Sequence, residues 1–164
     1  MLLYLLRHGI AEDHGSRGGD AERELTDEGK EKTGAALIAL KKMKLFPPEL
    51  VIASPLIRAQ QTAEIALETF ATDARFETSD ALTPMSEVTE TMALVAKWAR
   101  KFSRIMLVGH EPHLSSFGSA LLGSPTPVME MKKAAVAKFE ITHFDAPRMR
   151  GHLVALFPPK IGSL

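Results

Sequence analysis

Cysteine is absent from this 164-residue chain. Its absence excludes disulfides, iron–sulfur clusters, thiolate zinc sites and cysteine nucleophiles. An excess of charge is also missing, because 20 basic residues face 20 acidic ones, so nothing indicates a nucleic-acid or membrane partner. No apolar run reaches the ~20 residues of a membrane-spanning helix, and Arg7 and His8 end the first apolar stretch too early for a signal peptide. We therefore expect a cytoplasmic protein.

The order of apolar and polar segments predicts an α/β fold. A continuous apolar run at residues 1–6 and largely apolar runs at 49–53 and 104–109 are typical of buried strands. Amphipathic or capped segments between and after these strands predict four helices, at residues 27–44, 55–70, 87–101 and 112–122. The expected N-caps of the first three are Thr26, Ser54 and Ser86. This alternation of strands and helices is typical of a parallel sheet.

The end of the chain has a different pattern. Residues 133–141 and 151–157 alternate with a period of two, which predicts an antiparallel hairpin. We therefore expect one domain over residues 1–164, built as a three-layer α/β/α sandwich. Its mainly parallel sheet would carry the antiparallel hairpin at one edge.

Basic side chains follow each of the three predicted apolar strands. Arg7 and His8 follow the first, Arg58 comes soon after the second, and His110 follows the third. Because the carboxyl ends of parallel strands meet at one edge of a sheet, we expect these side chains to converge. Guanidinium groups match phosphate oxygens, and a neutral imidazole is a nucleophile. The pattern predicts phosphoryl transfer without a metal or other cofactor.

Four motifs in this order resemble the histidine phosphatase superfamily, whose fold is phosphoglycerate mutase-like. They are "LLRHG" at 5–9, "LTDEG" at 25–29, "SPLIRAQQTA" at 54–63 and "LVGHEP" at 107–112. The sequences "RHGIA", "LTP" and "KKAAVAKFE" are most similar to its small SixA-type branch of phosphohistidine phosphatases. The resemblance implies a signal-transduction enzyme whose substrate is a phosphohistidine on a phosphotransfer protein.

The resemblance also implies a role for individual residues of the motifs. His8 would be the nucleophile that carries a transient phosphohistidine, while Arg7 and Arg58 would clamp the phosphoryl group. His110 would donate a hydrogen bond to the phosphoryl oxygens and stabilise the transition state. Gly9 would orient the His8 imidazole through its carbonyl oxygen. The same four side chains, Arg7, His8, Arg58 and His110, would bind inorganic phosphate, the product.

The proton donor is less well defined. Larger relatives carry a catalytic glutamate on a long lid, but residues 71–85 leave little room for one, which predicts a shallow and open site. Glu87 is the best candidate for a donor, Glu12 and Asp13 are weaker ones, and the loop at 12–22 is a candidate rim that selects the substrate. A phosphoimidazole that is protonated on its second nitrogen leaves as neutral imidazole, so phosphohistidine would need little acid catalysis.

We therefore expect a monomeric or weakly dimeric phosphatase that hydrolyses phosphohistidine on a phosphotransfer protein. One alternative is a broad sugar or nucleotide phosphomonoesterase, which would depend more strongly on Glu87. Another is a catalytically silent module that binds phosphate or phosphohistidine, although a pure binder has no need for a nucleophile. A zinc site on His110 and His113 is disfavoured, because the nearby arginines would repel a cation.

Overall fold

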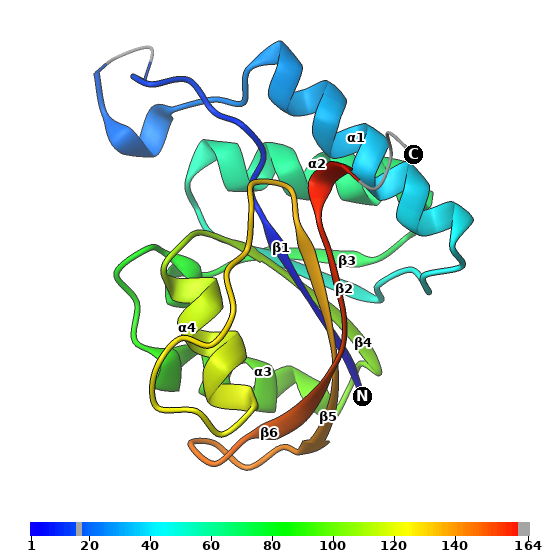
Figure 1. Cartoon of the computed structure of the whole chain (residues 1–164), viewed down its shortest axis with the longest axis vertical. Coiled ribbons are helices and arrows are strands. Elements are labelled where there is room, and N and C mark those ends of the chain that lie inside the picture. Colours follow the sequence, from blue (N-terminus) through cyan, green and yellow to red (C-terminus); the bar gives the residue numbers. More distant parts are fainter. Residues whose placement is uncertain (16–17, 161–164) are drawn as a thin grey trace.

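The computed structural model describes residues 1–15 and 18–160, which form a six-stranded sheet between two layers of helices (Figure 1). The strands are β1 (Leu2–Arg7), β2 (Leu50–Ala53), β3 (Arg75–Thr78), β4 (Arg104–Gly109), β5 (Val136–His143) and β6 (Arg150–Phe157). The helices are α1 (Asp27–Lys42), α2 (Ile57–Phe70), α3 (Val88–Ala99) and α4 (His113–Leu121), with short 3₁₀ helices η1 (Asp20–Glu22) and η2 (Asp80–Leu82). None of the helices in the described part is long and apolar enough to cross a membrane.

The strand order is β3-β2-β4-β1-β5-β6. The first four of these strands are parallel, β5 runs antiparallel to β1, and β6 completes a hairpin with β5 at the edge. The predicted α/β sandwich, with a mainly parallel sheet and an antiparallel edge hairpin, is therefore confirmed.

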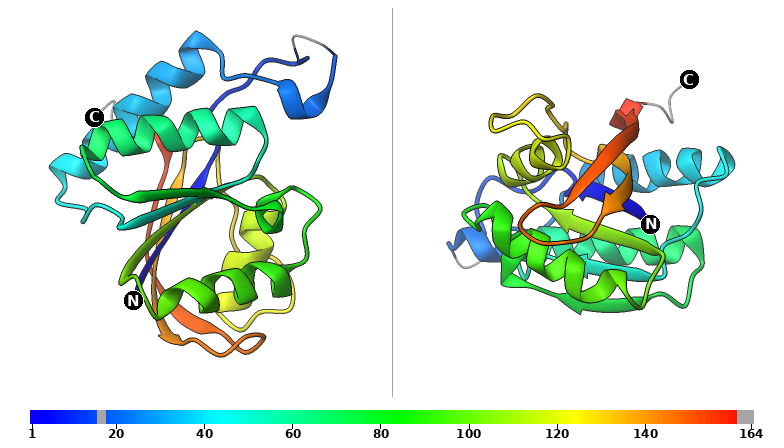
Figure 2. Two further views of the ribbon diagram at one scale, coloured as in Figure 1. Left: turned by 180° about the vertical axis from the view of Figure 1, so that it is seen from behind. Right: turned by 90° about the horizontal axis from the view of Figure 1, so that it is seen from below.

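Alternating side chains of the parallel strands build two cores, one on each face of the sheet. In β1, Leu3 and Leu5 face the cluster that includes α3 and α4, whereas Tyr4 and Leu6 face the cluster that includes α1 and α2. All four side chains are fully buried. Figure 2 shows the two helix pairs on opposite sides of the sheet. Because both faces are covered, only the ends of the strands are left to form a site.

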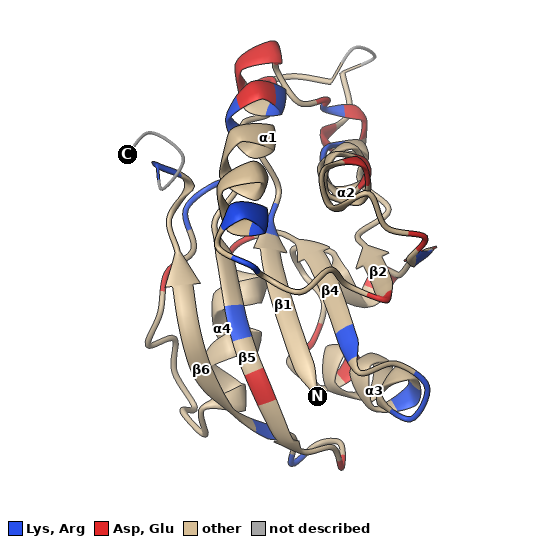
Figure 3. Ribbon diagram, turned by 90° about the vertical axis from the view of Figure 1, so that its right-hand side faces the viewer, with Lys and Arg blue, Asp and Glu red and all other residues tan. Residues whose placement is uncertain are grey.

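Helix α1 begins as the sequence predicts. The Thr26 side chain accepts a hydrogen bond from the Gly29 backbone at 3.0 Å, which satisfies one of the free N–H groups of the first turn. Acidic residues lie in the first turn and basic residues in the last, as the colours of α1 in Figure 3 show. This distribution complements the helix dipole.

The predicted N-caps of α2 and α3 are wrong. Ser54 accepts a hydrogen bond from the Leu56 backbone at 3.4 Å and closes a turn before the helix, so Leu56 is the N-cap of α2. Ser86 donates its hydroxyl proton to the carbonyl of Asp80 at 2.5 Å, which leaves Glu87 as the N-cap of α3. In both cases the serine caps a local turn instead of the helix.

Candidate active site

The carboxyl ends of β1 and β4 bring two histidines together. Arg7, the last residue of β1, lies opposite Gly109, the last residue of β4. His8 and His110 follow these two positions, and the His8 backbone donates a hydrogen bond to the Gly109 carbonyl at 3.0 Å. The two imidazole rings are 5.0 Å apart between centroids. The topology therefore places side chains that are far apart in the sequence at one point of the sheet edge.

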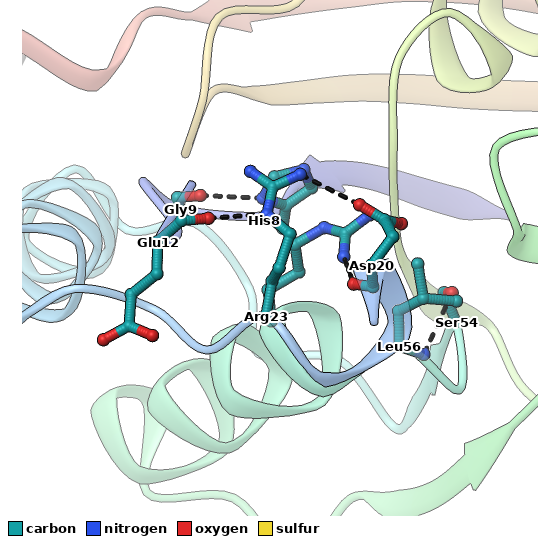
Figure 4. Close-up of polar contacts among 8 residues, drawn as sticks. His8, Gly9, Glu12, Asp20, Arg23, Ser54 and Leu56 are labelled. Carbon is teal, nitrogen blue, oxygen red and sulfur yellow. Dashed lines mark hydrogen bonds and ion pairs between the residues drawn. The ribbon is translucent and has the colours of Figure 1, made fainter. Parts of the chain in front are cut away.

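The orientation of the His8 imidazole is fixed by the backbone of Gly9. His8 Nδ1 lies 2.7 Å from the Gly9 carbonyl oxygen (Figure 4). A carbonyl can only accept a hydrogen bond, so Nδ1 carries the proton and Nε2 keeps its lone pair in the neutral ring. Gly9 itself donates to Thr62 Oγ1 at 3.1 Å, and a Cβ at Gly9 would lie 2.4 Å from Thr33 Oγ1. A larger residue fits there only if Thr33 or the backbone at Gly9 shifts.

Both histidines are buried, with exposed fractions of 7% for His8 and 2% for His110. Burial lowers the pKa of His8 from its ordinary 6.5 to about 4; the Gly9 hydrogen bond opposes this shift and the charge of Arg58 adds to it. Burial, followed by the charges of His8 and Arg58, lowers the pKa of His110 to about 3. Both rings are therefore neutral at physiological pH, which is the nucleophilic form of an imidazole.

Two arginines are held in the same way beside these rings. Arg7 Nη1 donates to the Met131 carbonyl, and Arg58 Nη1 donates to the Asp20 carbonyl, each at 2.7 Å. The Nε atoms of both arginines and both ring nitrogens of His110 are buried without a hydrogen-bond partner among the described residues. Buried polar groups are rarely left unpaired. Such a set of unpaired nitrogens is typical of a site whose ligand supplies the acceptors.

The segment before β5 supports the first arginine, and nothing in the sequence indicated this contact. Besides the Met131 carbonyl, the Ala134 backbone donates to the carbonyls of Arg7 and His8, each at 3.1 Å. Ala134 has a φ of 62°, so β5 begins at Val136 and not at residue 133 as predicted. The left-handed turn at Ala134 aims its N–H at the end of β1.

Asp20 is a residue of the site that sequence reasoning missed. Its carboxylate contacts Arg58 Nη2 through Oδ2 at 3.0 Å. It also contacts Arg23 Nη1 through Oδ1 at 2.9 Å (Figure 4). Arg23 Nε in turn donates to the Glu12 carbonyl at 2.5 Å. The polar run that contains Asp20 has no periodic pattern, so only the fold shows that it reaches α2, 38 residues away.

The same contacts cover one of the two arginines of the site. No long lid separates α2 from α3, as predicted, but η1 packs against α2 and covers Arg58, which is only 4% exposed. Within the loop at 12–22, Asp20 therefore reaches the site, while residues 16–17 of this loop lie outside the described part of the chain.

The three proposed proton donors are exposed, unlike the four central residues Arg7, His8, Arg58 and His110. Glu87 is exposed at the start of α3, where its backbone donates to Glu90 Oε2 at 3.3 Å. In the described structure no hydrogen bond or ion pair joins Glu87 to Arg7, His8, Arg58 or His110. Glu12 and Asp13 are exposed as well, and Glu12 contributes its carbonyl to Arg23 rather than its carboxylate to the site.

His113 has a structural partner. It is 3% exposed, and its Nε2 lies 2.8 Å from Thr91 Oγ1, which links α4 to α3. This contact accounts for a buried histidine three residues after His110, because the hydroxyl satisfies the ring nitrogen inside the core.

Residues 3–86 match the family model of the histidine phosphatase superfamily (branch 1). An uncharacterised protein of Picosynechococcus sp. is 33% identical over 138 residues, which are 83% of this chain and 82% of that protein. The chain therefore belongs to the histidine phosphatase superfamily.

Solved structures show the same fold. The protein histidine phosphatase SixA complexed with tungstate matches with a TM-score of 0.84 and 24% identity over 97% of both chains. A putative SixA from Agrobacterium tumefaciens matches with a TM-score of 0.76 and 21% identity over 94% and 96% of the two chains. A mycobacterial glucosyl-3-phosphoglycerate phosphatase with inorganic phosphate matches with a TM-score of 0.70 and 19% identity over 94% and 95%. The fold is thus phosphoglycerate mutase-like, as the sequence motifs predicted.

Proposed function

We propose that the protein is a SixA-type phosphohistidine phosphatase, which hydrolyses phosphohistidine on a phosphotransfer protein through a covalent intermediate on His8. The observation that carries the proposal is the buried, neutral His8 with a free Nε2 lone pair, next to two arginines whose Nε atoms are buried and have no hydrogen-bond partner among the described residues. Membership of the histidine phosphatase superfamily supports a phosphatase, and the SixA structures support this branch.

Binding of the phosphoryl group would satisfy three of the four unpaired nitrogens. Arg7 and Arg58 each donate an Nε–H to a phosphoryl oxygen, and His110 donates a ring N–H to another. These are charge-assisted or buried hydrogen bonds, which are strong because water is excluded. The nitrogens are held before the substrate arrives, so little reorganisation is needed as charge spreads over the phosphoryl oxygens.

In the first chemical step, the His8 Nε2 lone pair forms a bond to phosphorus while the bond to the leaving group breaks. The leaving group takes the electron pair of that bond. The His8 ring becomes cationic, and the Gly9 carbonyl stabilises it through the Nδ1 proton. In the second step, water attacks phosphorus, the phosphorus–Nε2 bond breaks, and His8 returns to its neutral form as inorganic phosphate leaves.

The choice of substrate rests on the leaving group. An alkoxide leaving group needs a proton from an acid, whereas protonated phosphoimidazole leaves as neutral imidazole. In the described structure Glu87, the best candidate for such an acid, is exposed and makes no hydrogen bond or ion pair with the four central residues, which favours the substrate that needs no acid. Transfer from one imidazole to another is also nearly isoenergetic, so the first step has little thermodynamic cost.

The direct test is phosphate release from a phosphotransfer domain that carries phosphohistidine, in the presence of a chelator. Wild-type protein is compared with His8→Asn, and a phosphoserine peptide and a sugar phosphate are run in parallel. We expect fast release from phosphohistidine, with complete loss in His8→Asn. Turnover of the sugar phosphate alone would instead indicate a general phosphomonoesterase. Tight phosphate binding without any turnover would indicate a binding module.

A further inference from the structure

One carboxylate lies at the solvent edge of a site in which His8, Arg58 and His110 are buried. The Asp20 side chain is 61% exposed, whereas the Arg58 side chain that it contacts is 5% exposed. Each carboxylate oxygen of Asp20 accepts one hydrogen bond, from Arg23 and Arg58 respectively. A carboxylate accepts about four hydrogen bonds. Asp20 therefore keeps acceptor capacity toward solvent, while two arginines fix its position.

The leaving group must lie on this exposed side. Phosphoryl transfer proceeds with the attacking and leaving atoms roughly in line. The attacking atom belongs to His8, which is 7% exposed, so the leaving group points away from the buried ring and toward the mouth of the site. Asp20 lies at this mouth, close enough to His110 for its charge to act on that ring.

We propose that Asp20 is a specificity-determining residue, whose carboxylate accepts a hydrogen bond from the protonated ring nitrogen of the substrate phosphohistidine. This inference rests on the proposed function. As the bond between phosphorus and the substrate nitrogen breaks, that nitrogen takes the electron pair. The proton on the other ring nitrogen stays there, so the product is neutral imidazole. Asp20 neither gains nor loses a proton.

The charge of Asp20 suits this role. The groups that act on its carboxylate are Arg23 beside η1 and Arg58 from α2. The carboxylate in turn acts on His110 after β4. The hydrogen bond from Arg23, followed by the bond and charge of Arg58, holds the pKa of Asp20 below its ordinary value. A fixed anion favours the protonated, cationic ring of phosphohistidine. The same anion disfavours an alkoxide or phenolate leaving group, on which negative charge develops.

The test is a comparison of two leaving groups in Asp20→Asn, with Glu24→Gln as the control. The asparagine side chain would keep an oxygen for Arg58 but lose the charge, and Glu24 is an exposed acid of the same segment. The substrates are the phosphohistidine-bearing phosphotransfer domain, phosphoimidazole and p-nitrophenyl phosphate. We expect kcat/KM for the two phosphoimidazoles to fall about tenfold in Asp20→Asn. For the ester we expect no loss, or a rise of up to about threefold.

Two further readouts separate specificity from a merely structural role. The tungstate affinity of Asp20→Asn should equal or exceed that of the wild type, because the arginine clamp is intact. The pH optimum for phosphoimidazole should move to lower pH, because the substrate ring loses the carboxylate that favours its protonation. Glu24→Gln should change neither the pH optimum nor the ratio between the substrates.

Other outcomes would overturn the inference. A parallel loss of phosphoimidazole and ester turnover, with weaker tungstate binding, would mean that Asp20 only positions Arg58. An unchanged ratio between the substrates would mean that Asp20 does not meet the leaving group. Failure of the proposed function would give a different result, because the wild type would then release no phosphate from the phosphotransfer domain. The effect of Asp20→Asn on the ratio of phosphoimidazole to ester turnover would still decide the role of Asp20.

Discussion

Acid should destabilise the fold, because two buried histidines resist protonation. In the folded chain the pKa is about 4 for His8 and about 3 for His110, against 6.5 for an ordinary histidine. The unfolded chain therefore binds more protons than the folded chain between these values. Stability from this source is complete above pH 6.5 and is lost as the pH falls toward the folded-state values.

The size of the effect follows from the same pKa values. Near pH 5, an unfolded histidine is almost fully protonated while His8 and His110 are still neutral, so each contributes a loss of about 2 kcal/mol. Together they remove about 4 kcal/mol relative to neutral pH, which is a large part of the ~5–15 kcal/mol by which a typical domain is stable.

The assay is urea unfolding of the wild type near pH 7.5 and near pH 5, compared with His110→Asn and with the exposed control His143→Asn. His110→Asn removes one of these titrating groups. Its loss of unfolding free energy between the two pH values should therefore be smaller than in the wild type by about 2 kcal/mol. His143→Asn should lose as much as the wild type. The same acid loss in His110→Asn as in the wild type would refute the reasoning.

Three other variants test the geometry of the site. Gly9→Ala should lose about 1–3 kcal/mol of stability in urea and most of its turnover, because its Cβ would collide with Thr33; a wild-type midpoint would contradict the tight fit. Arg58→Lys should weaken tungstate binding about tenfold by calorimetry, since lysine has no planar fork; unchanged affinity would exclude the clamp. Glu87→Gln should leave phosphohistidine turnover within about twofold, and a large loss would restore Glu87 as proton donor.

Strand-end residues were predictable from the sequence. The apolar runs of β1 and β4 fix where each strand stops, and parallel strands place those stops at one edge, so Arg7, His8 and His110 could be brought together without coordinates. Arg58 was predictable for a similar reason, because it lies in the first turn of the helix after β2. The periodicity of apolar residues and the order of strands and helices are regular signals, and most of the fold could be predicted from them.

Contacts made by irregular segments were not predictable in this way. Asp20 reaches Arg58 from a polar loop, and the Met131 carbonyl reaches Arg7 across 124 residues. Neither contact leaves a pattern in the sequence, since a backbone carbonyl is present at every position. The predicted N-caps of α2 and α3 were wrong for a related reason. The side chains of Ser54 and Ser86 can cap a helix or hydrogen-bond to the backbone of a nearby turn, and the structure shows the second arrangement.

The central claim is that His8 is the nucleophile, and trapping its phosphorylated form tests this most directly. The protein is mixed with a phosphohistidine-bearing phosphotransfer domain and quenched in base within milliseconds, because phosphohistidine survives base better than acid. Peptide mass spectrometry then locates the phosphoryl group. We expect the phosphoryl group on His8 of the wild type and no phosphorylated peptide from His8→Asn, which should also release no phosphate. Phosphate release by His8→Asn at the wild-type rate would contradict this claim.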